Sequence, residues 1–526
     1  MTEPAIRHEV HYGRVVRCFS ERPANVDQLL RDAVAHAPDQ VALVLGDTRL
    51  TYRDFDAKVS AVAANLLSLG LAPGDRVALL MGNTIEFAVC TMATARAGLI
   101  AVPMNVRQRR PEIAFVLQQC TAAVLVYDAE QEVNLPDAEE MPSVQHVVCV
   151  SGSGRGMPFA DLERAGSSID FPELPEESTY CLLYTSGTTG RPKGAMLSHF
   201  GVVHSVMHYQ HGFQLNESDV GVLAVPGSHV TGLVAILLTM IRCAGTTVIM
   251  PAFKAKHFLE LAERERMSYT LIVPAMYNLC LLDPNFSRYD LKSWTKAGFG
   301  GAPMPAATVE RLAQTLPDLQ LVNCYGSTET TSPSTLLPFG AIATHPTSVG
   351  KALPCADMIV VDENGVEVAS GTSGEIMIAG PMVVPGYWDN PDANAKGFVG
   401  GYWLSGDVGS KDENGFIYVH DRKKDMINRA GFKVYCIEVE STLSYHPDVV
   451  EVAVIGKPDP VLGEKVHAFV WSDGRPQDPA SLKAWCAERL SDYKVPDSIS
   501  FLDEPLPRNP NGKILKTTLR EQLPAS

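Results

Sequence analysis

The window YTSGTTGRPKG, residues 184–194, concentrates small, hydroxylated and basic residues that together could bind an anion. Glycines let backbone N–H groups turn toward a bound group, hydroxyls add donors, and Lys193 supplies a compact positive charge. This composition predicts a cradle for a polyphosphate. It differs from the ordinary P-loop, in which a glycine directly precedes the lysine, because Pro192 stands at that position.

A flexible Ser/Gly turn is the plain alternative for such a window. The apolar run CLLYT (181–185) predicts a buried strand that leads into the loop, and a helix is expected after it. A loop held between two regular elements, with hydroxyls and a lysine inside it, favours anion binding over a flexible turn.

Helix and strand patterns alternate through about residue 330 and must position this loop. The segment 25–38 predicts an amphipathic helix capped by Asn25, and a second helix is expected behind an Asp54 cap. Apolar strand candidates then follow, namely VLVY, HVVCV, CLLYT, GVLAV, TVIM, YTLIV and LVNCY. The alternation predicts an α/β fold of doubly wound subdomains, with helices on both faces of a parallel sheet.

The pattern changes in the last third of the chain. From Thr347 to Val419, short strands separated by Gly, Asn and Asp turns predict an antiparallel or barrel-like segment. The final block of about a hundred residues contains two predicted helices, CIEVESTLSYHP and PASLKAWCAERLSDY, and reads as a small α+β domain. We therefore expect a large domain over residues 1–422 and a small domain over residues 423–526.

Composition excludes several function classes. The chain has 526 residues, 46% hydrophobic and 20% charged, with a net charge of -16. An acidic chain of this kind argues against nucleic-acid or anionic-membrane partners, because both need a basic face. The longest apolar run, from Val230 to Ile241, is shorter than the roughly 20 residues of a membrane-spanning helix. No secretion signal or integral membrane segment is expected.

Eleven cysteines are spread along the chain without a CxxC pair or a zinc-type spacing. We interpret them as reduced, mostly buried thiols, which is typical of a cytoplasmic protein.

The loop window resembles the phosphate-loop signature of the adenylate-forming superfamily, which comprises acyl-CoA synthetases, adenylation domains and beetle luciferases. Segments similar to the other family motifs follow in order: GGAP (300–303), YGSTET (325–330), YWLSGDVG (402–409), DRKKDMI (421–427), GFKVYCIEVE (431–440) and PRNPNGKILK (507–516). The resemblance covers nearly the whole chain and is greatest to bacterial-type acyl-CoA synthetases. It implies ATP, Mg2+ and coenzyme A as cofactors.

The resemblance also implies a reaction in two halves. A carboxylate attacks the α-phosphorus of ATP to give acyl-AMP and pyrophosphate, and a thiol then displaces AMP. The loop would hold the β- and γ-phosphates through Thr185, Ser186, Gly187, Thr188, Thr189, Gly190 and Lys193.

Other matched positions would bind the rest of the nucleotide. Tyr325 offers a flat face for the base, Asp407 would accept the ribose hydroxyls beside Arg422, and Thr328 would reach the α-phosphate. Glu329 matches the Mg2+ ligand of the family, and one carboxylate is enough for a magnesium ion that also binds phosphate oxygens and water. The remaining implied contacts with the nucleotide are Gly301, Ala302, Pro303, Asn323, Cys324 and Gly326.

Three positions of the small domain carry roles in the family. Lys513 matches a mobile catalytic lysine that neutralises charge as the adenylate forms, and Lys424 matches the hinge about which the domain rotates. Gly431 lies in AGFKV, which resembles the strand that lines the pantetheine tunnel. Two residues depart from the pattern: Asn428 stands where many relatives have lysine, and Cys436 where a proline is common.

The acid substrate is the least specified part of the reaction. The resemblance places His229 and Val230 in the acyl pocket, with Phe299 and Gly300 nearby. The segment around His229 has no aspartate to pair a substrate ammonium, and an unpaired buried charge is costly. We expect an apolar acid, whether fatty, aromatic or alicyclic; His229 could equally be a satisfied core histidine.

Several activities share these motifs. The leading hypothesis is an AMP-forming acid:CoA ligase, and the alternative is a stand-alone adenylating enzyme that loads an acyl carrier protein. A luciferase-type oxygenase would use the same residues. A non-catalytic descendant would be expected to have lost Lys513 or Glu329, and both are present.

Overall fold

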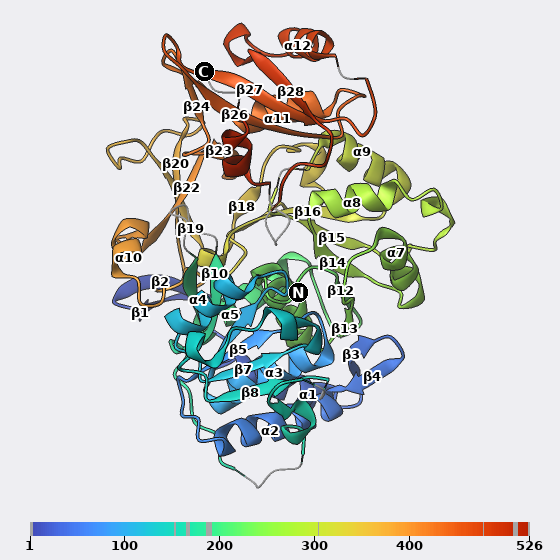
Figure 1. Ribbon diagram of the computed structural model, residues 1–526, viewed down its shortest axis with the longest axis vertical. Coiled ribbons are helices and arrows are strands. Elements are labelled where there is room, and N and C mark those ends of the chain that lie inside the picture. Colours follow the sequence, from blue (N-terminus) through green and yellow to red (C-terminus); the bar gives the residue numbers. More distant parts are fainter. Residues whose placement is uncertain are drawn as a thin grey trace.

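The computed structural model describes residues 4–151, 154–164, 169–185, 192–302, 304–476, 478–508 and 514–523. Within these residues the strands form four sheets: a hairpin, a seven-stranded sheet, a 14-stranded sheet and a five-stranded sheet. Figure 1 shows the five-stranded sheet at the top of the molecule and the seven-stranded sheet at the bottom.

The seven-stranded sheet carries the predicted phosphate loop at one edge. Its order is β11-β10-β6-β5-β7-β8-β9, and the strands are parallel except for the antiparallel pair β10 and β11. The strands are β5 (Arg76–Leu80), β6 (Ile100–Met104), β7 (Val124–Tyr127), β8 (His146–Cys149), β9 (Met157–Pro158), β10 (Thr179–Thr185) and β11 (Lys193–Ser198).

Five helices of the first 212 residues pack around these strands, within the part of the chain that the structure describes. They are α1 (Val26–His36), α2 (Tyr52–Ser68), α3 (Ile85–Ala97), α4 (Arg110–Gln119) and α5 (His199–Gly212). The predicted alternation of helices with parallel strands is confirmed.

The 14-stranded sheet changes from parallel to antiparallel pairing at β16. Its order is β19-β20-β22-β23-β18-β17-β16-β15-β14-β12-β13-β3-β4, and β21 pairs with β22. The parallel part and its edge comprise β3 (Val41–Leu45), β4 (Thr48–Thr51), β12 (Val220–Leu223), β13 (Thr246–Ile249), β14 (Tyr269–Ile272), β15 (Lys296–Phe299) and β16 (Gln320–Tyr325).

The antiparallel part confirms the change of pattern predicted from the turn-rich sequence. It comprises β17 (Thr335–Leu336), β18 (Gly350–Ala352), β19 (Asp357–Val361), β20 (Gly374–Ala379), β21 (Phe398–Val399), β22 (Tyr402–Lys411) and β23 (Phe416–Arg422). Helices beside this large sheet are α6 (Thr239–Arg242), α7 (Ala255–Arg264), α8 (Pro274–Leu281), α9 (Ala306–Thr315) and α10 (Pro391–Gly397).

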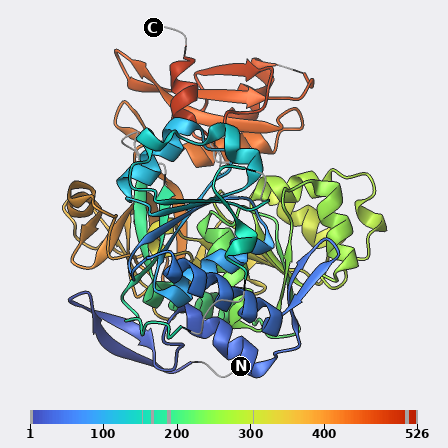
Figure 2. The same ribbon diagram turned by 60° about the horizontal axis from the view of Figure 1, so that its bottom comes forward.

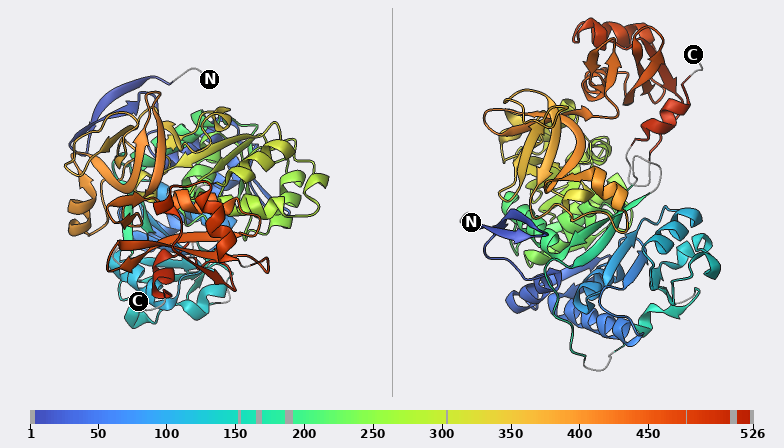
Figure 3. Two further views of the ribbon diagram at one scale, coloured as in Figure 1. Left: turned by 90° about the horizontal axis from the view of Figure 1, so that it is seen from above. Right: turned by 90° about the vertical axis from the view of Figure 1, so that its left-hand side faces the viewer.

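The small C-terminal domain has a sheet of its own, in the order β25-β24-β27-β26 with β28 beside β27. Its elements are β24 (Ile427–Arg429), β25 (Phe432–Val434), α11 (Cys436–Ser444), β26 (Glu451–Asp459), β27 (Gly463–Trp471), α12 (Pro479–Ala487), β28 (Ser498–Leu502) and α13 (Lys516–Glu521). Figure 3 shows this domain set apart from the rest of the chain. The boundary at residues 422 and 423 remains a prediction.

The N-terminal hairpin, β1 (Ile6–His11) and β2 (Arg14–Phe19), projects from the body of the molecule in Figure 2. Arg14 ties it to the antiparallel region by donating to the carbonyl oxygens of Gly401 and Val383, at 3.0 and 2.9 Å. The residues that follow the hairpin contact α5, the helix that leads away from β11.

Two local predictions have different outcomes at helix starts. Asn25 caps α1, and its side chain accepts from the backbone N–H of Gln28 at 3.0 Å, as predicted. The predicted Asp54 cap is wrong. Thr51 is the N-cap of α2, and Asp54 is the third helical residue of its capping box. Thr51, three residues before Asp54, has the same capping chemistry, and the β3–β4 hairpin, in which β4 ends at Thr51, decided between them.

The expected helix directly after the phosphate loop is also wrong. Lys193–Ser198 forms β11, which pairs antiparallel with β10, and α5 begins only at His199. The backbone hydrogen-bond partners of β11 come from β10. The composition of a short segment does not predict such a partner.

All eleven cysteines lie in the described residues, and all are buried and outside any disulfide, as predicted. No described helix combines the length and the apolar content that a membrane crossing requires. The cytoplasmic location stays a prediction.

Buried histidines anchor α5 to the N-terminal segment. His199 Nδ1 accepts from the backbone N–H of Val26 at 3.2 Å, and His204 Nε2 accepts from that of Phe19 at 3.3 Å. Burial lowers the pKa of His199 to about 4 and that of His204 to about 3. Both rings therefore stay neutral in the folded protein where an exposed histidine would bind a proton.

This burial predicts a loss of stability in acid. Between pH 6.5 and about 4 the unfolded chain binds more protons than the folded chain, so the free energy of unfolding falls as the pH falls. Each such histidine contributes about 1.4 kcal/mol per pH unit. We expect His204→Gln to lower the midpoint of guanidinium unfolding at pH 7.5. The free energy of unfolding of this variant should depend less steeply on pH, by the amount that corresponds to about one proton. An unchanged slope for His204→Gln would contradict the prediction.

Candidate active site

The carboxylate of Glu329 lies at the end of β16, where the parallel part of the large sheet meets its antiparallel part. The strand ends at Tyr325, and Thr328–Thr330 forms a single 3-10 turn. Ser327 caps this turn: its Oγ accepts from the backbone N–H of Glu329 at 3.1 Å and donates to Glu329 Oε2 at 2.9 Å. The cap fixes the direction of the Glu329 side chain, and Thr328 beside it is buried.

Hydroxyl groups from three separate elements converge on Glu329. Besides Ser327, the Tyr387 hydroxyl donates to Oε1 at 3.0 Å, and Thr185 Oγ1 lies 3.5 Å from the same oxygen. Among the described residues, no lysine or arginine forms an ion pair with this carboxylate. Its partners among the described residues are neutral hydroxyl groups.

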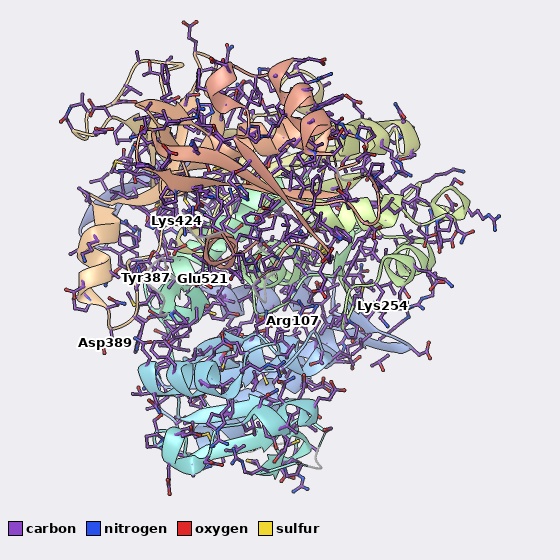
Figure 4. The ribbon with its side chains drawn as sticks, turned by 45° about the horizontal axis from the view of Figure 1, so that its top comes forward. Arg107, Lys254, Tyr387, Asp389, Lys424 and Glu521 are labelled. Atoms are coloured by element: carbon purple, nitrogen blue, oxygen red, sulfur yellow. The ribbon has the colours of Figure 1, made fainter. Side chains whose placement is uncertain are left out.

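Tyr387 is fixed by backbone pairing with the strand that follows the phosphate loop. Its segment runs antiparallel to β11 through the bridge between Ala195 and Tyr387, and Trp388 N donates to Gly194 O at 2.8 Å. The Tyr387 ring lies under the Lys193 ammonium, 5.1 Å from Nζ to the ring centroid. Figure 4 labels Tyr387 on the side of α10, below the strands of the small domain.

Thr185, the last residue of β10, and Lys193, the first residue of β11, are register partners and flank the predicted phosphate loop. The structure thus brings both ends of the loop to the Glu329 carboxylate, through Thr185 directly and through Lys193 by way of Tyr387. The predicted loop residues Ser186, Gly187, Thr188, Thr189 and Gly190 lie outside the described residues.

A second cluster joins Tyr325, Asp407 and Arg422. The Tyr325 hydroxyl donates to Asp407 Oδ2 at 2.6 Å, and Arg422 Nε lies 2.8 Å from Asp407 Oδ1. Asp407 and Arg422 are register partners on β22 and β23. Burial and the adjacent Asp407 hold the pKa of Tyr325 well above its usual value, so the phenol keeps the proton that it donates.

The backbone geometry at GGAP explains the presence of glycine at both of its first two positions. A Cβ on Gly300 would lie 2.5 Å from the carbonyl oxygen of Cys324, so Gly300 allows β15 and β16 to approach at their ends. Gly301 has a φ of +77°, which favours glycine. Ala302 beside it is exposed, and Pro303 lies outside the described residues.

The residues on either side of Tyr325 are hydrogen-bonded or closely packed. Asn323 Nδ2 donates to the carbonyl oxygen of Ser348 at 3.0 Å. Cys324 is buried, and a Cβ on Gly326 would lie 3.1 Å from Pro333 Cα. Asn323 is thus oriented by a partner on the adjoining loop, and Gly326 lets the Pro333 backbone approach.

His229 is a neutral imidazole in a fixed orientation. Its Nδ1 accepts from the backbone N–H of Thr231 at 3.2 Å, and burial lowers its pKa to about 4. A neutral ring whose Nδ1 is an acceptor carries its proton on Nε2. His229 lies just before the π-helical segment Thr231–Leu238. Val230 and Phe299, the last residue of β15, are buried in two hydrophobic cores.

Some predicted site residues lie apart from these two clusters. Lys424 and Gly431 are exposed on the small domain, and no contact of either with Glu329 or Asp407 is found among the described residues. Lys513 lies outside the described residues. Of the predicted residues of the large domain, the structure brings together two sets: Thr185, Lys193 and Glu329 in one cluster, and Tyr325, Asp407 and Arg422 in the other. The roles of all the predicted site residues stay predictions.

Two side chains that donate to Glu329 were missed from the sequence. Ser327 stood inside YGSTET and could have been chosen from its capping position two residues before the carboxylate. Tyr387 contacts Glu329 across 58 positions, and its local signal, a glycine and two aromatic residues in PGYWDN, does not indicate that contact.

Comparison with known protein families gives matches over most of the chain. The family profile described as AMP-binding enzyme matches residues 30–388, and the AMP-binding enzyme C-terminal domain matches residues 438–513.

Curated relatives extend the match over nearly the full length. The long-chain-fatty-acid--CoA ligase FadD13 of Mycobacterium tuberculosis is 34% identical, over 95% of this chain and 99% of its own. Feruloyl-CoA synthase of Amycolatopsis sp is 34% identical over 92% and 96%. The fatty acid--[acyl-carrier-protein] ligase ScoC of Streptomyces coeruleorubidus is 33% identical over 93% and 94%.

A solved structure matches in two states. ATP-bound MatB from Rhodopseudomonas palustris superposes with a TM-score of 0.87 at 30% identity, covering 95% of this chain and 99% of that chain. The apo form of MatB, at the same identity and coverage, superposes with a TM-score of 0.79. The arrangement described here is closer to the ATP-bound form.

Proposed function

Because the chain belongs to the AMP-binding enzyme family and is an AMP-forming ligase of the acyl-CoA synthetase class, we propose that it activates an apolar carboxylic acid as the acyl-adenylate and transfers the acyl group to coenzyme A. Fatty, aromatic and alicyclic acids are the proposed substrate range.

One observation carries the proposal: both ends of the loop reach the distant Glu329, Thr185 directly and Lys193 by way of Tyr387. Donors and a lysine at the loop ends would bind the polyphosphate, and the carboxylate beside them would hold its metal ion. Fixed donors aimed at developing charge are worth about 3 kcal/mol each in enzymes.

Glu329 fits a magnesium ion. Magnesium binds through one or two carboxylates together with phosphate oxygens and water, and Glu329 offers one carboxylate whose described partners are neutral hydroxyls. When bound, the ion would neutralise phosphate charge next to the loop. Ser327 and Tyr387 would keep the carboxylate directed toward it.

The second cluster supports a role for Asp407 in orienting the nucleoside. Tyr325 and Arg422 hold its carboxylate in one position, and this prior fixation lowers the entropy lost when ribose hydroxyls bind. Small-domain residues would complete each half of the reaction: Lys513 in adenylate formation, and Lys424 and Gly431 after the domain rotates. Residues 1–422 and 423–526 are the proposed units of this rotation.

The acyl site is proposed around His229, with Val230, Phe299 and Gly300 as neighbours. The neutral imidazole offers an N–H rather than a positive charge, which suits an acid with a largely apolar tail. Relatives named for fatty-acid and feruloyl substrates support this range.

A panel of fatty, aromatic and alicyclic acids tests the proposal. Each acid is scored for ATP-dependent pyrophosphate release with and without CoA, and the thioester is identified by mass. We expect at least one apolar acid to release pyrophosphate and to form its CoA thioester. If no acid in any class released pyrophosphate, the proposed function would be wrong.

The alternative acceptor is an acyl carrier protein, which the similarity to ScoC favours. With the best acid of the panel, CoA and phosphopantetheinylated carrier proteins are compared at equal concentration. Preference for the carrier would replace CoA as the proposed acceptor, while leaving the adenylation step unchanged.

Tyr387→Phe should lower kcat/KM about tenfold and raise the Mg2+ concentration needed for half-maximal rate, because it removes a hydrogen bond to a charged group of roughly 1.5–3 kcal/mol. The phenyl ring still contacts Lys193, so Tyr387→Leu should be more harmful. Tyr418→Phe, which also removes a hydroxyl beside a carboxylate, is the matched control and should behave as the parent. Equal Mg2+ dependence of Tyr387→Phe and the parent would exclude this role.

A further inference from the structure

The small domain is joined to the large domain without a shared core. Each hydrophobic cluster of the described residues lies wholly before residue 420 or wholly after residue 426. Figure 3, right, shows the small domain at one end of the molecule. Domains that lack a large apolar interface move relative to each other by default. Individual polar contacts across the junction can therefore set which arrangement is populated.

One such contact is buried beside the hinge. Asp421, near the end of β23 in the large domain, is 2% exposed, and its Oδ2 accepts from the backbone N–H of Cys436 at 2.5 Å. Cys436 is the first residue of α11 in the small domain. The bond therefore spans the segment that contains Lys424.

Asp421 acts as the cap of α11 from outside the helix. The N-cap residue, Tyr435, makes no side-chain capping bond, so the first turn of α11 receives its acceptor from the large domain. A carboxylate at this end also interacts favourably with the helix dipole. Burial raises the pKa of Asp421 to about 6, and the nearby Lys516, which is paired with Glu440 at 2.7 Å, acts against this rise.

The bond depends on the backbone N–H of Cys436. A proline at this position would have no backbone N–H and could not donate to Asp421. The Cys436 thiol has a separate partner, since its Sγ donates to Asp425 O at 3.0 Å. The thiol contact and the backbone contact can therefore be removed one at a time.

We propose that Asp421 and Cys436 are positioning residues: their hydrogen bond across the hinge holds the small domain in the arrangement described here, which we assign to adenylate formation. The closer superposition on the ATP-bound than on the apo form of MatB supports this assignment. Rotation of the small domain about Lys424 moves α11 away from β23 and breaks the bond. The assignment to one half-reaction rests on the proposed function, whereas the effect on domain position does not.

Cys436→Pro tests the proposal with little cost to the helix. Proline is favoured at the first position of a helix, and the extended conformation of Tyr435, φ -85° and ψ 118°, is compatible with a following proline. Cys436→Ala is the matched control, because it removes the thiol and keeps the N–H. Asp421→Ala removes the acceptor instead, and serves if the proline variant does not fold.

The first readout is the distance between the domains. Spin labels on cysteines introduced at the exposed Asn364 and Val461 report it, since the native cysteines are buried. We expect Cys436→Pro to shift the population between domain arrangements roughly tenfold, the size expected for a buried hydrogen bond to a charge. Cys436→Ala should match the parent, and the double variant with Asp421→Ala should show no further shift.

The second readout is the ratio of the two half-reactions. Cys436→Pro should slow acid-dependent pyrophosphate release relative to thioester formation from supplied acyl-AMP. An unchanged distance distribution in a folded Cys436→Pro variant, or an equal shift in Cys436→Ala, would overturn the proposal. If no acid is activated, the proposed function fails, and the distance measurement still decides whether the bond positions the domain.

Discussion

Replacing Glu329 with glutamine should lower the maximal rate of acid-dependent pyrophosphate release by about a thousandfold, the loss seen when a charge-stabilising group is removed from an active site. Glutamine keeps the length of the side chain and can still accept from Tyr387, so the fold should be unchanged. The negative charge that would hold Mg2+ is lost.

Nucleotide binding separates this role from general damage. In the parent, Mg2+ should increase the affinity for ATP measured by calorimetry, and in Glu329→Gln this increase should disappear while metal-free binding remains. Glu265→Gln, which neutralises a carboxylate paired with Arg49 away from the site, is the control and should behave as the parent. Parental rates for Glu329→Gln at saturating Mg2+ would refute the assignment.

Lys513→Ala should abolish adenylate formation to a similar extent, about a thousandfold, if it supplies the charge that neutralises the substrate carboxylate and α-phosphate. Thioester formation from supplied acyl-AMP should stay within a few-fold of the parent, because this half of the reaction no longer needs that charge. The two half-reactions are measured as acid-dependent pyrophosphate release and as CoA thioester formed.

The control for Lys513→Ala is Lys457→Ala, a lysine on β26 of the same domain. It should leave both half-reactions unchanged. Equal loss of both halves in Lys513→Ala would show that the lysine is needed for the stability of the domain or for both steps, and its proposed role would be withdrawn.

Local sequence was sufficient where neighbours along the chain make the contact. The cap of α1 by Asn25 uses a residue three positions away, and the strands β7, β8 and β10 were identified as short apolar runs. The same reasoning placed the cap of α2 at Asp54 and predicted a helix in place of β11. Both predictions were wrong because the outcome depended on strand pairing. Local propensity is weak where a distant strand supplies the hydrogen-bond partners.

In the candidate site, too, the residue types were predicted from the sequence and the long-range contacts were not. Tyr325, Glu329, Asp407 and Arg422 were selected from their motifs, and the structure brings them into two clusters. The motifs alone did not predict which of these side chains form hydrogen bonds or ion pairs with one another. Tyr387 was missed because its contact with Glu329 joins β11, the segment beside α10 and the turn after β16, which approach one another only in the folded protein.

By itself, the sequence determined the residue types at each site position, the alternation of helices and strands, and the presence of a separate C-terminal domain. Only the tertiary structure decided that Tyr387 joins Lys193 to Glu329 and that Asp421 caps a helix of the other domain. The reason is physical: side-chain chemistry and short-range periodicity are properties of the local chain, whereas these contacts exist only after sheets and domains have packed together.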